Sequence, residues 1–382
     1  MKHPILVLAV LLPWLTAAMH AATLTVSSPL DYQVVQRASR DRGVVRIAGE
    51  FADPVAGAET IEARLVTDGK GGKWRRIARK PAGARFEARW EAPAGGWHRL
   101  EVRAMGGGKV LAETAVAHVG VGEVFVVAGQ SNSANHGEER QQPKTGMVAA
   151  FDGKRWQVAN DPQPGAGGGG GSFMPPFGDA IAARFRVPVG IVACGEGGTS
   201  VREWLPKGAR FPNPPTVLSH VSKLLEGDWT CDGVLYAKLV ARMQSMGARG
   251  FRAVLWHQGE SDANQRDTTR TLAGPLYRDY LARIVRDSRR EAGWEVPWFV
   301  AQASYHVPGD ESSPEIRAAQ AALWKDGVAL EGPDTDALKG ALRDGGGQGV
   351  HFSGPGLREH GVRWAEKVGP WIERSTKRGL WK

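Results

Sequence analysis

Cysteine is nearly absent from this sequence, because only Cys194 and Cys231 of its 382 residues are of this type. Two cysteines cannot build a disulfide scaffold or a cysteine-rich zinc site, and they are compatible with either one disulfide or two free thiols. No internal repeat is found, and beyond the N-terminus no apolar run is long enough to span a bilayer. A hydrophobic share of 42% with 23% charged residues excludes a disordered chain, a coiled coil and a collagen.

A compact apolar run lies at the N-terminus. Lys2 and His3 precede apolar residues 4–15, and mostly small residues follow up to position 22. This pattern predicts a secretory signal peptide over residues 1–22, since the run is short of the roughly 20 residues of a transmembrane helix. An uncleaved anchor is the alternative, because Met19 and His20 blur the cleavage site. We therefore expect an exported chain, periplasmic or extracellular, whose mature form has no membrane span.

The next hundred residues have the pattern of short strands. Apolar and polar residues alternate in five segments, which are separated by glycine, proline and aspartate turns. These segments are residues 23–27, 44–48, 61–66, 85–90 and 97–103. Period-2 alternation at about ten-residue spacing predicts a small all-β sandwich, which we assign as an accessory domain over residues 23–119.

From about residue 120 the rhythm changes to strands that alternate with helices. Continuous apolar runs, typical of buried parallel strands, occur at residues 124–128, 187–193, 253–256 and 296–301. Amphipathic helices are predicted around residues 234–243 and 276–284, from Ser313-Pro314 onward, and over residues 355–373. This order predicts an α/β domain with a doubly wound parallel sheet over residues 120–382.

Candidate site residues follow the predicted strands, at the edge where ligands bind in open α/β sheets. Ser131 comes directly after the strand at 124–128, where it is either an exposed hydroxyl or a helix N-cap. A glycine cluster at residues 195–198 follows the strand at 187–193, and it is either a backbone approach to a ligand or a tight turn. The glycine-rich residues 166–172 are read as a flexible loop, because no Gly-Lys-Ser/Thr follows them.

A third cluster, residues 257–262 (His-Gln-Gly-Glu-Ser-Asp), follows the strand at 253–256. No second histidine stands at helical spacing from His257, so no metal site is assigned. His351 precedes the last predicted helix.

A serine ester hydrolase needs a nucleophile, a base, a carboxylate that orients the base, and donors for the oxyanion. Ser131 is the candidate nucleophile, His351 the base and Glu260 the orienting carboxylate. The pair Gly197/Gln258 is the candidate for the oxyanion donors.

These blocks resemble the sialate O-acetylesterase and carbohydrate acetylesterase branch of the SGNH hydrolases. The resemblance rests on residues 129–132 (Gly-Gln-Ser-Asn), 197–204, 256–262 and 351–353, in that order over about 230 residues. It implies a flavodoxin-like SGNH sheet with Ser131 as nucleophile and His351 as general base. It also implies an oxyanion hole made by the N–H of Ser131, the N–H of Gly197 or Gly198, and the side chain of Gln258.

One position departs from the family pattern. An aspartate often stands three residues before the histidine, and here that position is Gln348. A neutral amide cannot stabilise an imidazolium electrostatically. Glu260 is therefore preferred as the orienting acid, as the resemblance to some members implies, with a Ser–His dyad or Asp344 as alternatives.

The resulting prediction is an exported serine esterase that removes O-acetyl groups from carbohydrate without a metal or organic cofactor. Asn132, Trp204 and Trp256 are the expected substrate contacts. A carbohydrate-binding protein on an esterase-like scaffold and an esterase for other acyl groups are the alternatives. The identity of the sugar, the acetyl position and the oligomeric state stay open.

The formal net charge of +9 is concentrated in the predicted β-sandwich. Between Arg64 and Lys109 there are twelve basic and four acidic residues, a local excess of +8. The α/β part is therefore close to neutral, and nucleic acid is not expected as a partner. The basic segment is either a contact for an anionic glycan or cell surface, or a solvated β face.

Overall fold

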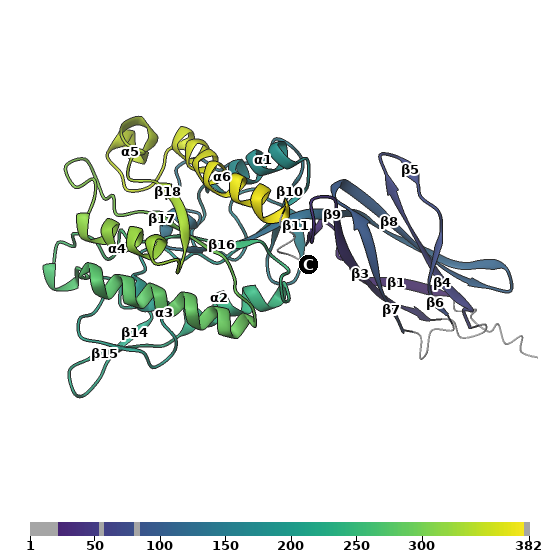
Figure 1. Ribbon diagram of the computed structural model, residues 1–382, viewed down its shortest axis with the longest axis horizontal. Coiled ribbons are helices and arrows are strands. Elements are labelled where there is room, and N and C mark those ends of the chain that lie inside the picture. Colours follow the sequence, from purple (N-terminus) through teal and green to yellow (C-terminus); the bar gives the residue numbers. More distant parts are fainter. Residues whose placement is uncertain (1–21, 53–56, 80–84, 378–382) are drawn as a thin grey trace, which may run out of the picture.

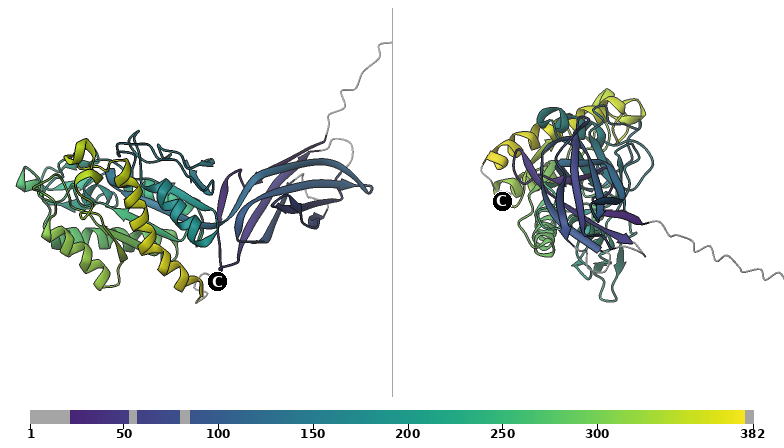
Figure 2. Two further views of the ribbon diagram at one scale, coloured as in Figure 1. Left: turned by 90° about the horizontal axis from the view of Figure 1, so that it is seen from above. Right: turned by 90° about the vertical axis from the view of Figure 1, so that its right-hand side faces the viewer.

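The structure is a computed structural model that describes residues 22–52, 57–79 and 85–377. The predicted signal peptide at 1–22 lies, apart from its last residue, outside these ranges. Figures 1 and 2 show two regions placed end to end, one made of strands and one of strands and helices. We call residues 22–119 the strand region and residues 120–377 the α/β region.

The strand region holds two sheets around one apolar core. One sheet has the antiparallel order β1-β3-β7, and the other pairs β6, β4 and β8 with the first part of β9. The strands are β1 (Thr23–Ser28), β2 (Gln33–Gln36), β3 (Arg42–Ala52), β4 (Thr60–Thr67), β5 (Lys70–Gly71), β6 (Arg75–Arg79), β7 (Arg85–Pro93), β8 (Gly95–Gly106) and β9 (Lys109–Gly129). Inward residues of both sheets, such as Ile47, Ile61 and Leu100, pack into one cluster. The predicted period-2 segments coincide with strands of this region.

Strand β9 belongs to both regions. It pairs antiparallel with β8 up to Val121, and then parallel with β12 and β16 from Glu123 onward. The crossing point requires glycine: a Cβ at Gly122 would lie 1.8 Å from the carbonyl oxygen of Pro188, and one at Gly120 would lie 2.9 Å from Pro188 Cβ. A single strand therefore leads from the strand region directly into the centre of the other sheet.

The α/β region is built on a mostly parallel sheet with the order β11-β10-β12-β9-β16-β17-β18, in which only β11 is antiparallel. The further strands are β10 (Val148–Phe151), β11 (Trp156–Val158), β12 (Val189–Ala193), β16 (Ala253–His257), β17 (Trp298–Gln302) and β18 (Leu330–Asp334). Without the β10-β11 edge, the parallel strands follow the order 2-1-3-4-5 of flavodoxin-like sheets. The predicted strands at 124–128, 187–193, 253–256 and 296–301 are confirmed in substance.

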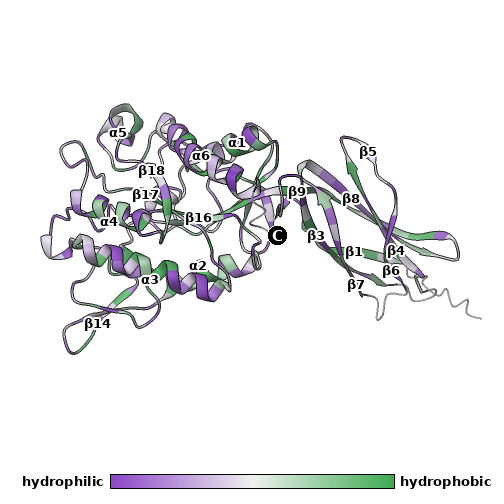
Figure 3. Cartoon of the chain, in the orientation of Figure 1, coloured by the Kyte–Doolittle hydropathy of each residue, from purple (hydrophilic) through white to green (hydrophobic). Residues whose placement is uncertain are grey.

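Helices cover both faces of this sheet. On one face α1 (Met174–Phe185) packs against α6 (Gly354–Lys377), and on the other lie α2 (Val234–Ser245), α3 (Gly274–Ala292) and α4 (Pro314–Lys325). Ser313 caps α4, because its Oγ accepts from the N–H of Ile316 at 3.5 Å. Figure 3 shows β16 mostly hydrophobic and α3 with both kinds of residue, as expected for a buried strand and an amphipathic helix.

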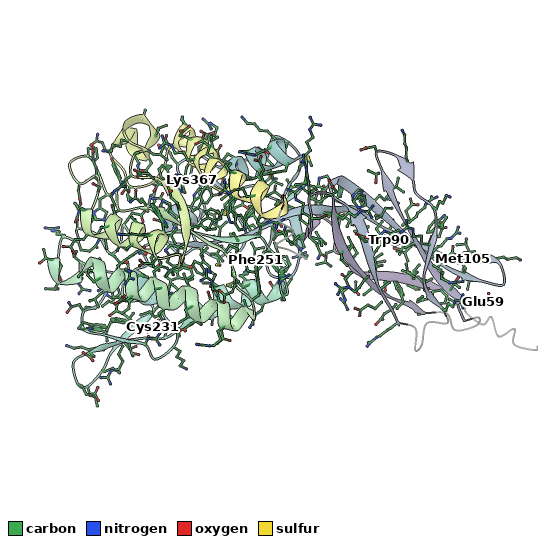
Figure 4. All side chains as sticks on the ribbon, viewed as in Figure 1. Glu59, Trp90, Met105, Cys231, Phe251 and Lys367 are labelled. Atoms are coloured by element: carbon green, nitrogen blue, oxygen red, sulfur yellow. The ribbon has the colours of Figure 1, made fainter. Side chains whose placement is uncertain are left out.

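Short elements complete the α/β region. They are η2 (Ser131–Ser133), η3 (Val201–Trp204), β13 (Arg210–Phe211), β14 (Val221–Lys223), β15 (Trp229–Cys231), η4 (Thr268–Arg270), η5 (Gly340–Leu342) and α5 (Asp344–Gly347). Figure 4 places the labelled Cys231 at the small sheet of β13, β15 and β14, and the labelled Phe251 within the α/β region.

Both cysteines are free and buried. Burial raises the pKa of Cys194 to about 12 and that of Cys231 to about 11, so both thiols stay protonated. Within residues 22–52, 57–79 and 85–377, no helix is long and apolar enough to cross a membrane. The same part of the chain contains no group of three or more His, Cys, Asp or Glu side chains that could hold a metal ion.

Candidate active site

A cavity of about 740 Å³ opens at the carboxyl edge of the parallel sheet. Of the residues predicted for the site, Ser131, Gly198, Glu260 and His351 line it. The other lining residues are Gln130, His136, Thr216, Val217, Ser261, Asn264, Gln265, Arg266, His306, Val307, Asp310 and Val350. Loops that are far apart in the sequence thus meet at one place.

Ser131 stands at the end of β9, where the chain turns into η2. Gly129 has a φ of +124°, and a Cβ there would lie 2.0 Å from the carbonyl oxygen of His257, so only glycine fits beside β16. The N–H of Gln130 then donates to that same carbonyl at 2.9 Å, and Ser133 N–H donates back to Gln130 at 2.8 Å. The turn is therefore fixed on both sides, and it presents Ser131 to the cavity.

His351 is held by Asp344. Its Nδ1 lies 3.4 Å from Asp344 Oδ2, and its backbone N–H donates to Asp344 Oδ1 at 3.1 Å. A run of three glycines with positive φ, residues 345–347, returns the chain so that these partners meet across seven positions. A Cβ at Gly349 would lie only 1.7 Å from Asp344 Oδ1, so this approach requires glycine as well. The carboxylate beside His351 is therefore Asp344, while Gln348 takes no part in the pair.

Glu260, the preferred orienting acid in the sequence analysis, lies elsewhere. Its Oε1 accepts from Asn132 Nδ2 at 2.9 Å and is 3.6 Å from His257 Nδ1. Asn132 Nδ2 also donates to the carbonyl of Val350 at 3.2 Å. The assignment of Glu260 as the orienting acid therefore needs correction. Its carboxylate contacts Asn132 and His257, whereas the carboxylate next to the imidazole of His351 is that of Asp344. Asn132, expected at the substrate, is a buried link between Glu260 and this loop.

Gln258 is also placed differently from the expectation. It is fully buried, and its Nε2 donates to Asp262 Oδ2 at 2.7 Å, with Gln130 Oε1 and the Thr199 carbonyl each at 3.2 Å. An amide engaged in this way does not point to the cavity, so its assignment to the oxyanion hole is corrected. Gln258 instead fastens the ends of β9 and β16 to the loop after β12.

Trp204 and Trp256 form part of the core. Both are fully buried, and their rings meet edge to face at 5.3 Å between centroids. Trp204 Nε1 donates to Thr199 Oγ1 at 2.9 Å. Their expected contact with substrate is therefore corrected, because both indoles are buried in the apolar cluster and neither lines the cavity.

Sequence reasoning missed His136, which lines the cavity from the segment after η2. Its ring stacks on that of His351, with 5.4 Å between centroids and an interplanar angle of 26°. Burial and the neighbouring His351 lower the pKa of His136, against the opposing charge of Glu196. No motif marks this residue, because its position depends on how the glycine loops fold around it.

The glycine-rich residues 166–172 are held against the segment of His136. Backbone bridges join Asn135 to Gly168 and Gly137 to Gly171. The side chain of Asn135 donates to the carbonyls of Gln163 and Ala166 and accepts from Gln163 N–H. The predicted flexible loop is thus hydrogen-bonded to the segment that carries His136.

The strand order of the α/β region is that of a flavodoxin-like sheet, which is consistent with an SGNH-like carbohydrate esterase. Its carboxyl edge brings together a serine, a histidine and an aspartate beside the histidine, residue types that ester hydrolases use.

The family comparison specifies the class. The family "carbohydrate esterase, sialic acid-specific acetylesterase" matches residues 121–369, which is most of the chain. The chain belongs to this family, and it is a carboxylic ester hydrolase. No curated protein matches the chain.

Three solved structures are similar to this chain to different degrees. The chain is similar to XAC1771, a carbohydrate acetylesterase from Xanthomonas citri, with 20% identity and a TM-score of 0.52 over 91% of this chain and 74% of that one. NanS is similar at 17% identity and a TM-score of 0.44, over 66% of this chain and 98% of that one. An Arabidopsis thaliana protein has 21% identity and a TM-score of 0.44, over 64% and 96%.

Proposed function

We propose that this enzyme removes acetyl groups from O-acetylated carbohydrate through an acetyl-serine intermediate. The observation that carries the proposal is the pairing of His351 with Asp344 in the cavity that Ser131 lines. Ser131 Oγ attacks the acetyl carbonyl while His351 takes its proton. The C–O bond to the sugar then breaks, and His351 returns the proton to the leaving oxygen. Water attacks the acetyl-serine in the same way and releases acetate.

Asp344 acts as the orienting acid in this proposal. A carboxylate at Nδ1 fixes the imidazole tautomer and stabilises the imidazolium that forms in each step. Its distance of 3.4 Å in the free enzyme is long, as catalytic hydrogen bonds often are without substrate. Glu260 supports the same loop indirectly, through Asn132 and the carbonyl of Val350.

The proposed oxyanion hole consists of backbone donors. Ser131 begins the turn η2, so its N–H has no partner within that turn. Gly198, with a φ of +72°, lines the cavity opposite, and its N–H or that of Gly197 is the second donor. Such fixed dipoles stabilise a developing oxyanion without reorganisation.

An acidic sugar suits the rim of the cavity. Arg266 is exposed there and makes no ion pair within the described residues, whereas His306 beside it is paired with Asp310 at 2.7 Å. A carboxylate on the sugar would therefore meet a cation that the protein has not neutralised. This feature favours a sialate-type substrate over a neutral sugar. Trp204 and Trp256, which were expected to contact sugar, are buried in the core and give the alternative of a carbohydrate-binding protein no support.

Export and the domain division belong to the same proposal. We assign residues 1–22 to a signal peptide, residues 23–119 to an accessory domain and residues 120–382 to the esterase domain. A separate apolar cluster in the strand region supports the division. The basic excess of that region supports a role outside the active site.

The experiment that tests the mechanism is Ser131→Ala with a chromogenic acetate ester and a panel of acetylated glycans. Loss of at least about a thousandfold in kcat is expected, with an unchanged circular dichroism spectrum. A serine-reactive phosphonate should label Ser131 in the unmodified enzyme. Ser133→Ala is the matched control, because Ser133 lies in the same turn and its Oγ donates to the Gln130 carbonyl, away from the cavity. Full activity in Ser131→Ala would overturn the proposal.

A further inference from the structure

His136 differs from the other histidines of the cavity in its hydrogen bonding. His306 has both ring nitrogens engaged, at 2.7 Å from Asp310 Oδ2 and 2.6 Å from the Glu260 carbonyl, and His351 faces Asp344. Within the described residues, neither ring nitrogen of His136 has a hydrogen-bond partner. Half-buried polar groups of this kind are normally satisfied. Neither nitrogen of His136 is therefore committed to a protein partner, and the residue lines the cavity.

The ring of His136 is nevertheless held in place. A Cβ at Gly197 would lie 2.6 Å from His136 Nε2, and a Cβ at Gly168 would lie 2.9 Å from His136 Cδ2. The ring thus fits between two glycine turns, with His351 stacked on it. Backbone shape and packing fix this imidazole without a polar bond, so a ligand meets a preorganised group and displaces no protein partner.

The neighbourhood determines which part of the substrate His136 meets. His351 delivers its proton to the leaving oxygen, and His136 is stacked on His351. The acetyl group ends in a methyl, which offers no hydrogen bond, whereas the sugar carries hydroxyls beside the ester oxygen. Burial and the proximity of His351 lower the pKa of His136 and so favour the neutral imidazole, which has one donor and one acceptor. A neutral imidazole matches a hydroxyl, which also donates and accepts.

We propose that His136 hydrogen-bonds a free hydroxyl next to the scissile acetyl ester, and so selects partly acetylated sugars over esters without a neighbouring hydroxyl. This inference rests on the proposed function. It makes His136 a specificity-determining residue on the leaving-group side of the reaction.

The test compares two small esters of matched size, 2-hydroxyethyl acetate and propyl acetate, in which a methyl replaces the hydroxyl. Each kcat/KM is divided by the rate constant of alkaline hydrolysis, which removes intrinsic reactivity. The unmodified enzyme should prefer the hydroxyl ester by about tenfold, the effect of one good hydrogen bond. His136→Phe, which keeps a ring of similar shape, should reduce this preference to near unity. His136→Gln, which donates and accepts, should restore part of it.

His306→Phe is the matched control, since His306 lines the same cavity with both nitrogens already bonded, and it should keep the preference of the unmodified enzyme. Equal normalised rates for both esters in the unmodified enzyme would overturn the inference while the esterase mechanism stands. An undiminished preference in His136→Phe, or in His136→Leu should the first variant not fold, would do the same. Failure to hydrolyse either ester would refute the proposed function and this inference with it.

Discussion

The two regions of the molecule treat polar groups in opposite ways. The core of the strand region consists of apolar side chains, and ion pairs such as Arg46–Glu87, with both side chains 58% exposed, lie on its surface. The α/β region buries many polar side chains at the carboxyl edge of its sheet, among them Ser200, Arg202 and Asp262. Figure 4 shows side chains filling both regions, with the labelled Trp90 in one and Phe251 in the other.

The buried polar groups of the α/β region hold the geometry of its site, whereas the apolar core of the strand region contributes mainly to stability. A buried polar group weakens the fold unless it is fully bonded, so such groups are expected where geometry must be held precisely. Asp262 illustrates this, because it accepts from Ser200, Val201, Arg202 and Gln258 and so fixes the loop beside the cavity. The charge excess of the strand region says little about the reaction, whereas the buried network of the neutral region marks its site.

The largest effect expected in the α/β region comes from Asp344→Asn. The amide keeps the shape but cannot stabilise the imidazolium of His351, so kcat should fall by about a hundredfold to ten-thousandfold. Steady-state hydrolysis of a chromogenic acetate ester measures this change, with Gln348→Ala as the control. Near-normal activity in Asp344→Asn together with a large loss in Glu260→Gln would return the orienting role to Glu260.

The junction between the regions should be the most sensitive point for stability. Glu123 is fully buried between Arg37 at 2.7 Å and Arg252 at 2.5 Å. Burial pushes the pKa of Glu123 up, but the two guanidinium charges outweigh it and hold the pKa below its usual value. Glu123→Gln leaves buried cations without a counter-charge and should lower the free energy of unfolding by about 3–5 kcal/mol. Urea denaturation measures the free energy of unfolding. A change smaller than the experimental error would show that the junction tolerates unpaired charge.

A smaller effect is expected for substrate choice at the rim. Arg266→Ala should raise KM for an acetylated sugar that bears a carboxylate by about tenfold, because a charge-assisted hydrogen bond is lost. KM for an acetylated neutral sugar should change less. Arg266→Lys is the control that keeps the charge. An equal change for both substrates would contradict the assignment to an acidic sugar.

A still smaller effect, on the pH dependence of stability, is expected from Glu203. Burial raises its pKa to about 8, against the hydrogen bond from Ser200 N–H. In the unfolded chain the carboxyl ionises near its usual value of 4.5, so between these values the folded protein binds more protons than the unfolded one. Stability should therefore decline as pH rises from about 4.5 to about 8. Thermal melts at stepped pH measure this decline, and Glu203→Gln should make it less steep between pH 4.5 and about 8. An unchanged slope would show that other groups cause the decline.

The smallest effect is expected on the surface of the strand region. Glu87→Gln removes the exposed partner of Arg46, and solvent screens such pairs strongly. We expect no measurable shift in the melting temperature and no change in esterase activity. A clear loss of melting temperature or of esterase activity would show that exposed ion pairs in the strand region matter as much as the buried polar groups of the α/β region.

Periodicity was sufficient to predict most of the fold, because buried strands such as β16 have continuous apolar sequences and α3 repeats its apolar face every three to four residues. Strand β18 was missed because Leu330–Asp334 contains a glycine and an acidic end, and it is recognisable only through its pairing with β17. The motifs located the serine and the histidine loop correctly within the cavity. They could not decide which carboxylate faces His351, since that depends on the positive-φ glycines that return the chain to Asp344.

The continuous strand β9 has a mechanical consequence. Residues 109–129 form one hydrogen-bonded strand without an intervening linker. The backbone between the two regions therefore offers no loose segment for proteolysis or for hinge motion. Its paired neighbours on both sides resist bending at the crossing glycines. Because β9 is continuous, the strand region is held at a set distance and angle from Ser131, which lies two residues beyond the end of the strand.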